Sequence, residues 1–259
     1  MSDESTGRDL RMLSVRICEL ILLRDELTLR ICHQLERDYQ LKIGQLEYDA
    51  FLWRYRTMRL QSRLSLVQAA LEADGCVFLP AIESRLDREY APYEHQLGGR
   101  EARLEYAKEC ERETHLSAVE EAELRRMYKE VVWKVHPEIH PVSPSEKKLF
   151  LRAVRFYCEG DLPAMRSLVM ELNFLPERDL LCPALEPEEQ LELLQKMEQQ
   201  LDQEIDEIRS NIPYTFKEFL EDPFRVTEMQ QQLRTETEKW QAAYREYEEE
   251  MEELLGGTE

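Results

Sequence analysis

The chain has 259 residues, with 54 acidic against 34 basic side chains and a formal net charge of −20. Only 8 residues are glycine and 34% are charged, a composition typical of long helices rather than of strand-and-turn sandwiches or barrels. The 42% hydrophobic share is too large for a fully disordered chain. The acidity argues against nonspecific binding to nucleic acid or to anionic membranes, because either needs a basic face.

Neither a membrane span nor an export signal is predicted. No stretch approaches about 18 uninterrupted apolar residues. The start, Met1 to Glu4, is acidic and lacks the basic and then apolar segments of a secretory signal. The 6 cysteines are scattered without any Cys-x-x-Cys spacing. We therefore expect a soluble cytoplasmic protein whose cysteines remain thiols.

The charge is distributed unevenly along the chain. Residues 187–259 carry 7 basic and 21 acidic side chains, for a net −14, whereas residues 117–173 carry 9 of each. Proline-containing stretches near 137–144 and 176–187 add two further boundaries. The pattern predicts an all-α protein with three regions: a helical coiled-coil region (8–116), a small helical hairpin (117–173) and an acidic antiparallel helical hairpin (187–255).

The first region has the spacing of a coiled-coil seam. Apolar residues recur at three- and four-residue steps, with Arg24 as the one interruption; they are Leu13, Ile17, Leu20, Leu27 and Ile31. A second periodic run follows Gly44, and glycine is costly inside a helix. We favour two helices folded back as a hairpin at Gly44, with one continuous helix as the alternative. A third helix is predicted from about 82 to 114.

The last region is expected to form paired helices. A helix over 187–211 opens with Pro187-Glu188-Glu189, since proline is tolerated in the first turn and acids suit the positive end of a helix. Ile212-Pro213-Tyr214 interrupts it, and a polar helix is predicted from about 226 to 254. The natural arrangement for two such helices is an antiparallel hairpin.

The central region contains a short amphipathic helix over 123–135. Its apolar face is spaced by four, three and four residues and consists of Leu124, Tyr128, Val131 and Val135. The opposite and flanking positions carry the basic residues Arg125, Arg126, Lys129 and Lys134, together with Trp133.

This helix should stop at His136-Pro137, because a residue before proline is pushed out of helical geometry. A proline-containing loop from Glu138 to Ser145 follows, and a second helix is predicted from Glu146 to about Glu159. Its predicted inward residues are Phe150, Ala153, Val154 and Tyr157.

Helix, His-Pro-acid loop and antiparallel helix together resemble a J domain, the module by which Hsp40 co-chaperones engage Hsp70. The resemblance covers about 117–160, with His136-Pro137 at the signature His-Pro and Phe150 and Tyr157 at the core aromatics. It also looks like bacterial proteins in which a degenerate J-like segment lies between coiled-coil arms. The resemblance implies elongated helical arms flanking a small J-like hairpin.

The sequence departs from the family at the signature acid. The family has His-Pro-Asp, whereas here the acid is Glu138, whose extra methylene moves the carboxylate by about one bond length. In the family this acid is aimed at a fixed arginine of the partner. The short first helix of a J domain has no clear counterpart, and we expect the helix at 82–114 to take over its packing role.

No residues are nominated for catalysis, metal or cofactor binding. His136 and His140 have the four-residue spacing of zinc helices, but Pro137 lies between them and breaks the helix that such a pair needs. No Gly-x-Ser-x-Gly and no glycine-rich phosphate loop occurs. The glutamate runs near the C-terminus are expected to be a solvated helix face.

The resemblance therefore implies a non-enzymatic co-chaperone or adaptor for a DnaK-like Hsp70. The residues implied to bind that partner are His136, Pro137, Glu138, Arg125, Arg126, Lys129 and Lys134. The arms would bind a client or form a homo-oligomer. The alternative is a structural coiled-coil scaffold with a degenerate J-like hairpin that is inactive towards Hsp70.

Overall fold

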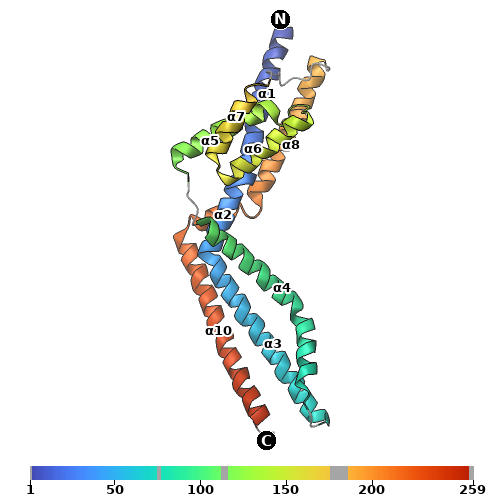
Figure 1. The fold of residues 1–259 in the computed structure, drawn as a ribbon, viewed down its shortest axis with the longest axis vertical. Coiled ribbons are helices and arrows are strands. Elements are labelled where there is room, and N and C mark those ends of the chain that lie inside the picture. Colours follow the sequence, from blue (N-terminus) through green and yellow to red (C-terminus); the bar gives the residue numbers. More distant parts are fainter. Residues whose placement is uncertain (1, 75–76, 112–115, 176–185, 257–259) are drawn as a thin grey trace. The chain divides into compact units, whose positions relative to one another are not determined.

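The computed structural model describes residues 2–74, 77–111, 116–175 and 186–256, and in these ranges it contains helices and no strand (Figure 1). The all-α class predicted from composition is confirmed. The chain forms two compact units, residues 1–36 with 114–217, and residues 37–113 with 218–259. Each unit therefore joins segments that are far apart in the sequence, and each is described below by itself.

The chain is helical without a break from Ser2 to Asp74. The consecutive segments are α1 (Ser2–Glu26), the π-helical turn η1 (Leu27–Ile31), α2 (Cys32–Tyr39), a second π-helical turn η2 (Gln40–Gly44) and α3 (Gln45–Asp74). The hairpin favoured at Gly44 is wrong, and the continuous helix is what the structure contains. A π-helical turn inserts residues without ending a helix. The helix cost of one glycine, about 1 kcal/mol, is small enough for packing to override.

In the first unit, three helices pack against one another, and the first two of them also pack against the N-terminal helical segment. They are α5 (Ala118–Val135), α6 (Pro144–Glu159) and α7 (Leu162–Leu172), and α1 lies against both α5 and α8 (Pro187–Ser210) (Figure 1). All contribute to one apolar core, whose largest fully buried members include Ile17, Leu20, Ile21, Leu124, Tyr128, Tyr157, Met165, Leu168 and Leu172.

Local sequence signals fix the ends of these helices. Ser117 and Ser143 each form a capping box with a glutamate three residues later, so α5 and α6 begin with their first amides satisfied. α6 ends at Gly160, whose φ of 70° is left-handed. Asp161 then caps α7, a helix that the sequence analysis did not predict.

In the second unit, α3 packs against α4 (Leu79–Glu111) and α10 (Pro223–Gly256), with the short α9 (Phe216–Leu220) before α10 (Figure 1). Leu64 and Val67 of α3 and Met251 of α10 are buried together. The helix expected at 82–114 is α4, whose described part ends at Glu111. Its expected packing role beside the central hairpin is wrong, because α1 packs on α5 instead.

The predicted bounds of the last two long helices agree with α8 and α10 to within three residues. Their expected pairing as a hairpin is wrong. α8 packs along α1, and its Leu201 and Ile205 enter the same core as Ile17. α10 packs along α3. The apolar seam of α8 is thus buried against α1, and that of α10 is buried against α3. Among the described residues, no helix is long and apolar enough to cross a membrane.

Candidate functional site

The predicted partner-binding residues lie along α5 and in the turn that follows it. The apolar face of α5 is fully buried, as its spacing predicted, at Leu124, Tyr128, Val131 and Val135. Met127 and Val132 are buried as well, because α1, α6 and α7 all pack on this helix. Only one stripe of α5 therefore faces solvent.

That exposed stripe is basic. Arg125, Arg126 and Lys129 are exposed, and Lys134 is half-buried. Arg126 pairs within its own helix, with Glu130 at 3.1 Å, whereas Arg125 reaches Glu26 of α1 at 2.7 Å. Lys134 donates to the side chain of Asn173 just after α7, at 3.2 Å. Arg126 and Lys129 are thus exposed members of the stripe, and Arg126 pairs only within α5 among the contacts described.

The turn after α5 is compact. His136 adopts extended geometry, as expected before a proline, and its carbonyl accepts hydrogen bonds from the amides of Ile139 and His140, each at 3.0 Å. The side chain of His140 is buried, with Nε2 2.7 Å from the carbonyl oxygen of Trp133. Pro137 and Glu138 are left at the exposed tip of the turn.

His136 is buried rather than presented to solvent, with only 3% of its surface exposed. Its ring packs edge-on against Phe150 of α6, with centroids 4.7 Å apart. Nδ1 accepts a hydrogen bond from the amide of Glu138 at 3.2 Å. A neutral ring accepting at Nδ1 carries its proton on Nε2, and Nε2 lies 3.7 Å from an Asp25 carboxylate oxygen.

Asp25 anchors the turn from α1. Its carboxylate accepts a hydrogen bond from the buried Tyr128 hydroxyl at 2.7 Å, and the Tyr128 ring stacks on Tyr157 with centroids 4.2 Å apart. Burial by itself raises the pKa of the Asp25 carboxyl. The contacts from His136 and Tyr128 and the Arg24 charge outweigh burial, so the pKa lies below its ordinary value.

Glu138 is held by the residue next to Asp25. Both terminal nitrogens of Arg24 donate to the Glu138 carboxylate, one to each oxygen, at 2.9 Å. Arg24 also donates to Glu204 of α8 at 3.0 Å and to Asp25 at 3.2 Å. Burial alone lowers the pKa of Arg24, but the hydrogen bonds that it donates to Glu138 and Glu204, together with the charge of Asp25, hold the pKa above its ordinary value. The guanidinium is therefore a permanent cation shared by three carboxylates.

Further polar contacts join the N-terminal helix to this region. Arg30 of η1 pairs with Glu121 of α5 and donates to the Tyr157 carbonyl of α6 at 2.7 Å. Together with Glu26–Arg125, these contacts tie the end of α1 and η1 to α5 and α6 by side-chain charges.

The turn residues were predicted from the sequence, whereas the roles of Arg24 and Asp25 were not. Arg24 was noted only as the charged interruption of an apolar seam. A charged residue within a buried apolar seam needs carboxylate or hydrogen-bonding partners. The position of Arg24 in the seam is therefore the sequence signal that could have identified it as a functional residue. Nothing in a single sequence indicates that the partner is Glu138.

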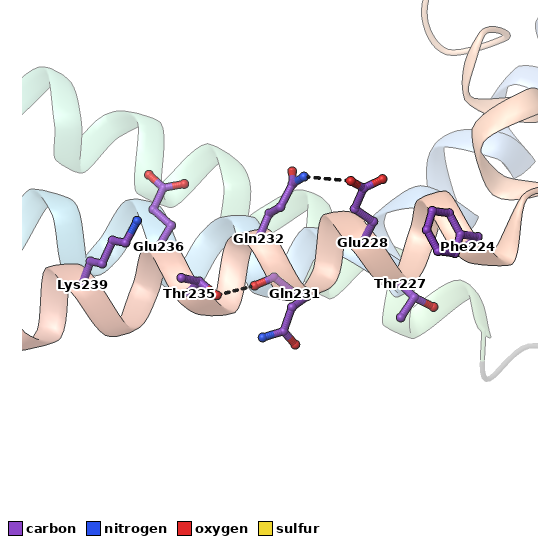
Figure 2. A pocket seen from close by; sticks show the side chains of 8 residues that line it. All are labelled: Phe224, Thr227, Glu228, Gln231, Gln232, Thr235, Glu236 and Lys239. Atoms are coloured by element: carbon purple, nitrogen blue, oxygen red, sulfur yellow. Dashed lines mark hydrogen bonds between the residues drawn. The ribbon is translucent and has the colours of Figure 1, made fainter.

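In the described part of the chain, no group of three or more His, Cys, Asp or Glu side chains that could hold a metal ion occurs. A surface hollow of about 790 Å³ is lined by α10 alone (Figure 2). Its side chains bond within that helix, Thr235 to the Gln231 carbonyl and Gln232 to Glu228, instead of converging on a point (Figure 2).

Comparison with known proteins adds no relative: no family model, no curated protein and no solved structure matches this chain.

Proposed function

We propose that this protein is a non-enzymatic, J-type co-chaperone or adaptor that docks a DnaK-like Hsp70 through α5 and the turn after it. The catalytic residues belong to the partner. This chain biases the partner towards the conformation that hydrolyses ATP. The proposed place of action is the cytoplasm, and the helices of the second unit provide the surface for a client or for a second copy of the chain.

The observation that carries this proposal is the exposed basic stripe of α5, which runs towards the exposed tip at Pro137 and Glu138. In a chain of net charge −20, a solvent-facing stripe with several cations is an exception to the overall charge. It is suited to steering an acidic partner surface onto one defined face. The buried side of α5 meanwhile fixes the orientation of the stripe.

The test is single-turnover ATP hydrolysis by a bacterial Hsp70 with and without this protein. Wild type is expected to accelerate hydrolysis, and the double charge reversal Arg126→Glu with Lys129→Glu is expected to abolish that effect without changing helicity. The matched control is Lys147→Glu with Lys148→Glu, which makes the same charge change on exposed positions of α6. A control variant as defective as the α5 variant would mean that net charge, and not this stripe, governs the effect.

The alternative is a structural scaffold whose J-like hairpin is inactive towards Hsp70. The specific observation in its favour is that two residues of the signature turn have internal roles: His136 is buried and Glu138 is bound by Arg24. Under this alternative the α5 charge reversal is silent. Substitution of aspartate for Leu64, which is buried between α3 and α10, should instead destroy assembly.

A further inference from the structure

We propose that Arg24 is an internal latch on the signature turn: it occupies the Glu138 carboxylate and must release it before Hsp70 can dock. The inference rests on the proposed function, since it names the regulation of the same site. It gives α1 a second role, because α1 then controls access to the turn as well as packing on α5.

The first support is the geometry of the pair. Arg24 approaches Glu138 as a fork, with one nitrogen on each carboxylate oxygen at 2.9 Å. A second forked guanidinium would need the same two oxygen positions, so Arg24 and an arginine of a partner cannot both be bound in this way. Docking through Glu138 therefore requires an exchange.

The second support is that the Arg24 guanidinium still has carboxylate partners after Glu138 is released. The Arg24 side chain is only 15% exposed, and an unpaired guanidinium there would be costly. It retains Glu204 and Asp25 as partners when Glu138 leaves, at the present distances of 3.0 Å and 3.2 Å. Glu138, which is 45% exposed, is the partner best able to turn towards solvent. The arrangement thus has two states in which Arg24 is paired.

The third support is that the turn has a separate anchor. Asp25 accepts from Tyr128 and lies beside Nε2 of His136, and His136 packs on Phe150. The contacts with Tyr128 and His136 use Oδ2 of Asp25, whereas Arg24 donates to Oδ1 of the same carboxylate at 3.2 Å. Opening the latch therefore frees the carboxylate at the tip while the buried base of the turn stays in place.

The first measurement is amide hydrogen exchange in the absence of Hsp70, on wild type and on Arg24→Met, which keeps the apolar stem and removes the charge. The amide of Glu138 is expected to exchange faster in the variant. The amides of Ile139 and His140 donate to the His136 carbonyl at the base of the turn and are expected to keep their wild-type rates. The matched control is Arg16→Met, which removes an arginine that also joins α1 to α8, through Glu198 at 3.7 Å, but is not bound to the turn. Unchanged exchange in Arg24→Met would overturn the latch.

The second measurement is Hsp70 single-turnover hydrolysis as a function of the concentration of this protein. An ion pair with a half-exposed carboxylate, such as Arg24–Glu138, shifts the equilibrium between bound and released carboxylate by up to about fivefold. Arg24→Met should therefore reach half-maximal stimulation at a concentration about two- to fivefold lower than wild type. Arg16→Met should match wild type. Adding Arg126→Glu and Lys129→Glu to Arg24→Met should remove the stimulation.

The outcomes separate this inference from the function on which it rests. If wild type stimulates and Arg24→Met is equal or weaker, the latch is wrong and the co-chaperone function stands. If only Arg24→Met stimulates, through Arg126 and Lys129, both are supported and the latch is tight. If no variant stimulates, both fail together.

Discussion

Arg24 and Glu138 are 114 positions apart in the sequence, yet they form a forked ion pair in which each guanidinium terminal nitrogen meets one carboxylate oxygen at 2.9 Å. Arg24 stands where the apolar seam of α1 is interrupted, and Glu138 stands at the exposed tip of the turn after α5. The charge that interrupts the seam is therefore paired with a carboxylate from a distant part of the chain.

The coupling between these two residues can be measured as a double-mutant cycle. We expect Arg24→Met and Glu138→Gln to be non-additive, with an interaction free energy of about 0.5–1.5 kcal/mol, because the pair is forked but its carboxylate is half-exposed. Urea unfolding followed by Trp133 fluorescence, with Trp53 and Trp240 replaced by phenylalanine, reports on the first unit. Additive effects would mean that the pair contributes no stability.

The lowered pKa of Asp25 leads us to expect that the stability of the first unit depends on pH. Its folded-state pKa is below the ordinary value of about 3.9, so the unfolded chain binds the proton more readily. The stabilising contribution of Asp25 is complete above about pH 4 and is lost as the pH falls through the lower, folded-state pKa.

Asp25→Asn removes this titration while leaving an oxygen to accept from Tyr128. We expect the free energy of unfolding to fall less steeply with decreasing pH in this variant than in wild type, over about pH 5 to 2. The measurement is the urea midpoint of the first unit at each pH. Asp206→Asn, at an exposed position of α8, should keep the wild-type slope; equal slopes in all three proteins would contradict the assignment.

The sequence predicted those parts of the fold that depend on local signals. The spacing of Leu124, Tyr128, Val131 and Val135 identified the buried face of α5, and Pro137 identified where the helix ends. The prolines at 187 and 213 marked the limits of α8 to within a few residues. Each of these features is decided by neighbours in sequence, through periodicity, capping or a missing amide donor.

Pairing between helices was not predictable in the same way. α8 and α10 are consecutive and both have an apolar seam, so a hairpin was the simplest arrangement. The choice of α1 and α3 as their partners depends on how well each seam fits, as at Leu201 with the core of the first unit and Met251 with Leu64. The role of Arg24 was hidden for the same reason, since Glu138, Glu204 and Asp25 converge only after folding.

Gly160 is the position where backbone conformation requires glycine. Its φ of 70° closes α6 and leads into α7, and an added Cβ would lie at an ordinary 3.5 Å from the Leu116 side chain. The cost of Gly160→Ala is therefore conformational, about 1–2 kcal/mol, and should lower the urea midpoint of the first unit. Gly160→Asn should lose less stability than Gly160→Ala, because asparagine tolerates the left-handed region. An alanine variant at least as stable as the asparagine variant would refute this explanation.

Gly44 should behave in the opposite way, because it lies inside a continuous helix. It has no positive φ, and an added Cβ would press only on the flexible end of the Gln40 side chain, which can turn aside. Alanine is favoured over glycine in a helix interior by about 1 kcal/mol, so Gly44→Ala should raise the stability of the second unit by up to that amount. Trp53 and Trp240 fluorescence, with Trp133 replaced by phenylalanine, monitors this unit.

Gly44→Pro provides the contrast, since proline removes an amide donor and should destabilise the second unit by about 3 kcal/mol or more. A destabilised alanine variant together with a tolerated proline would indicate that the chain turns at residue 44, as a hairpin requires.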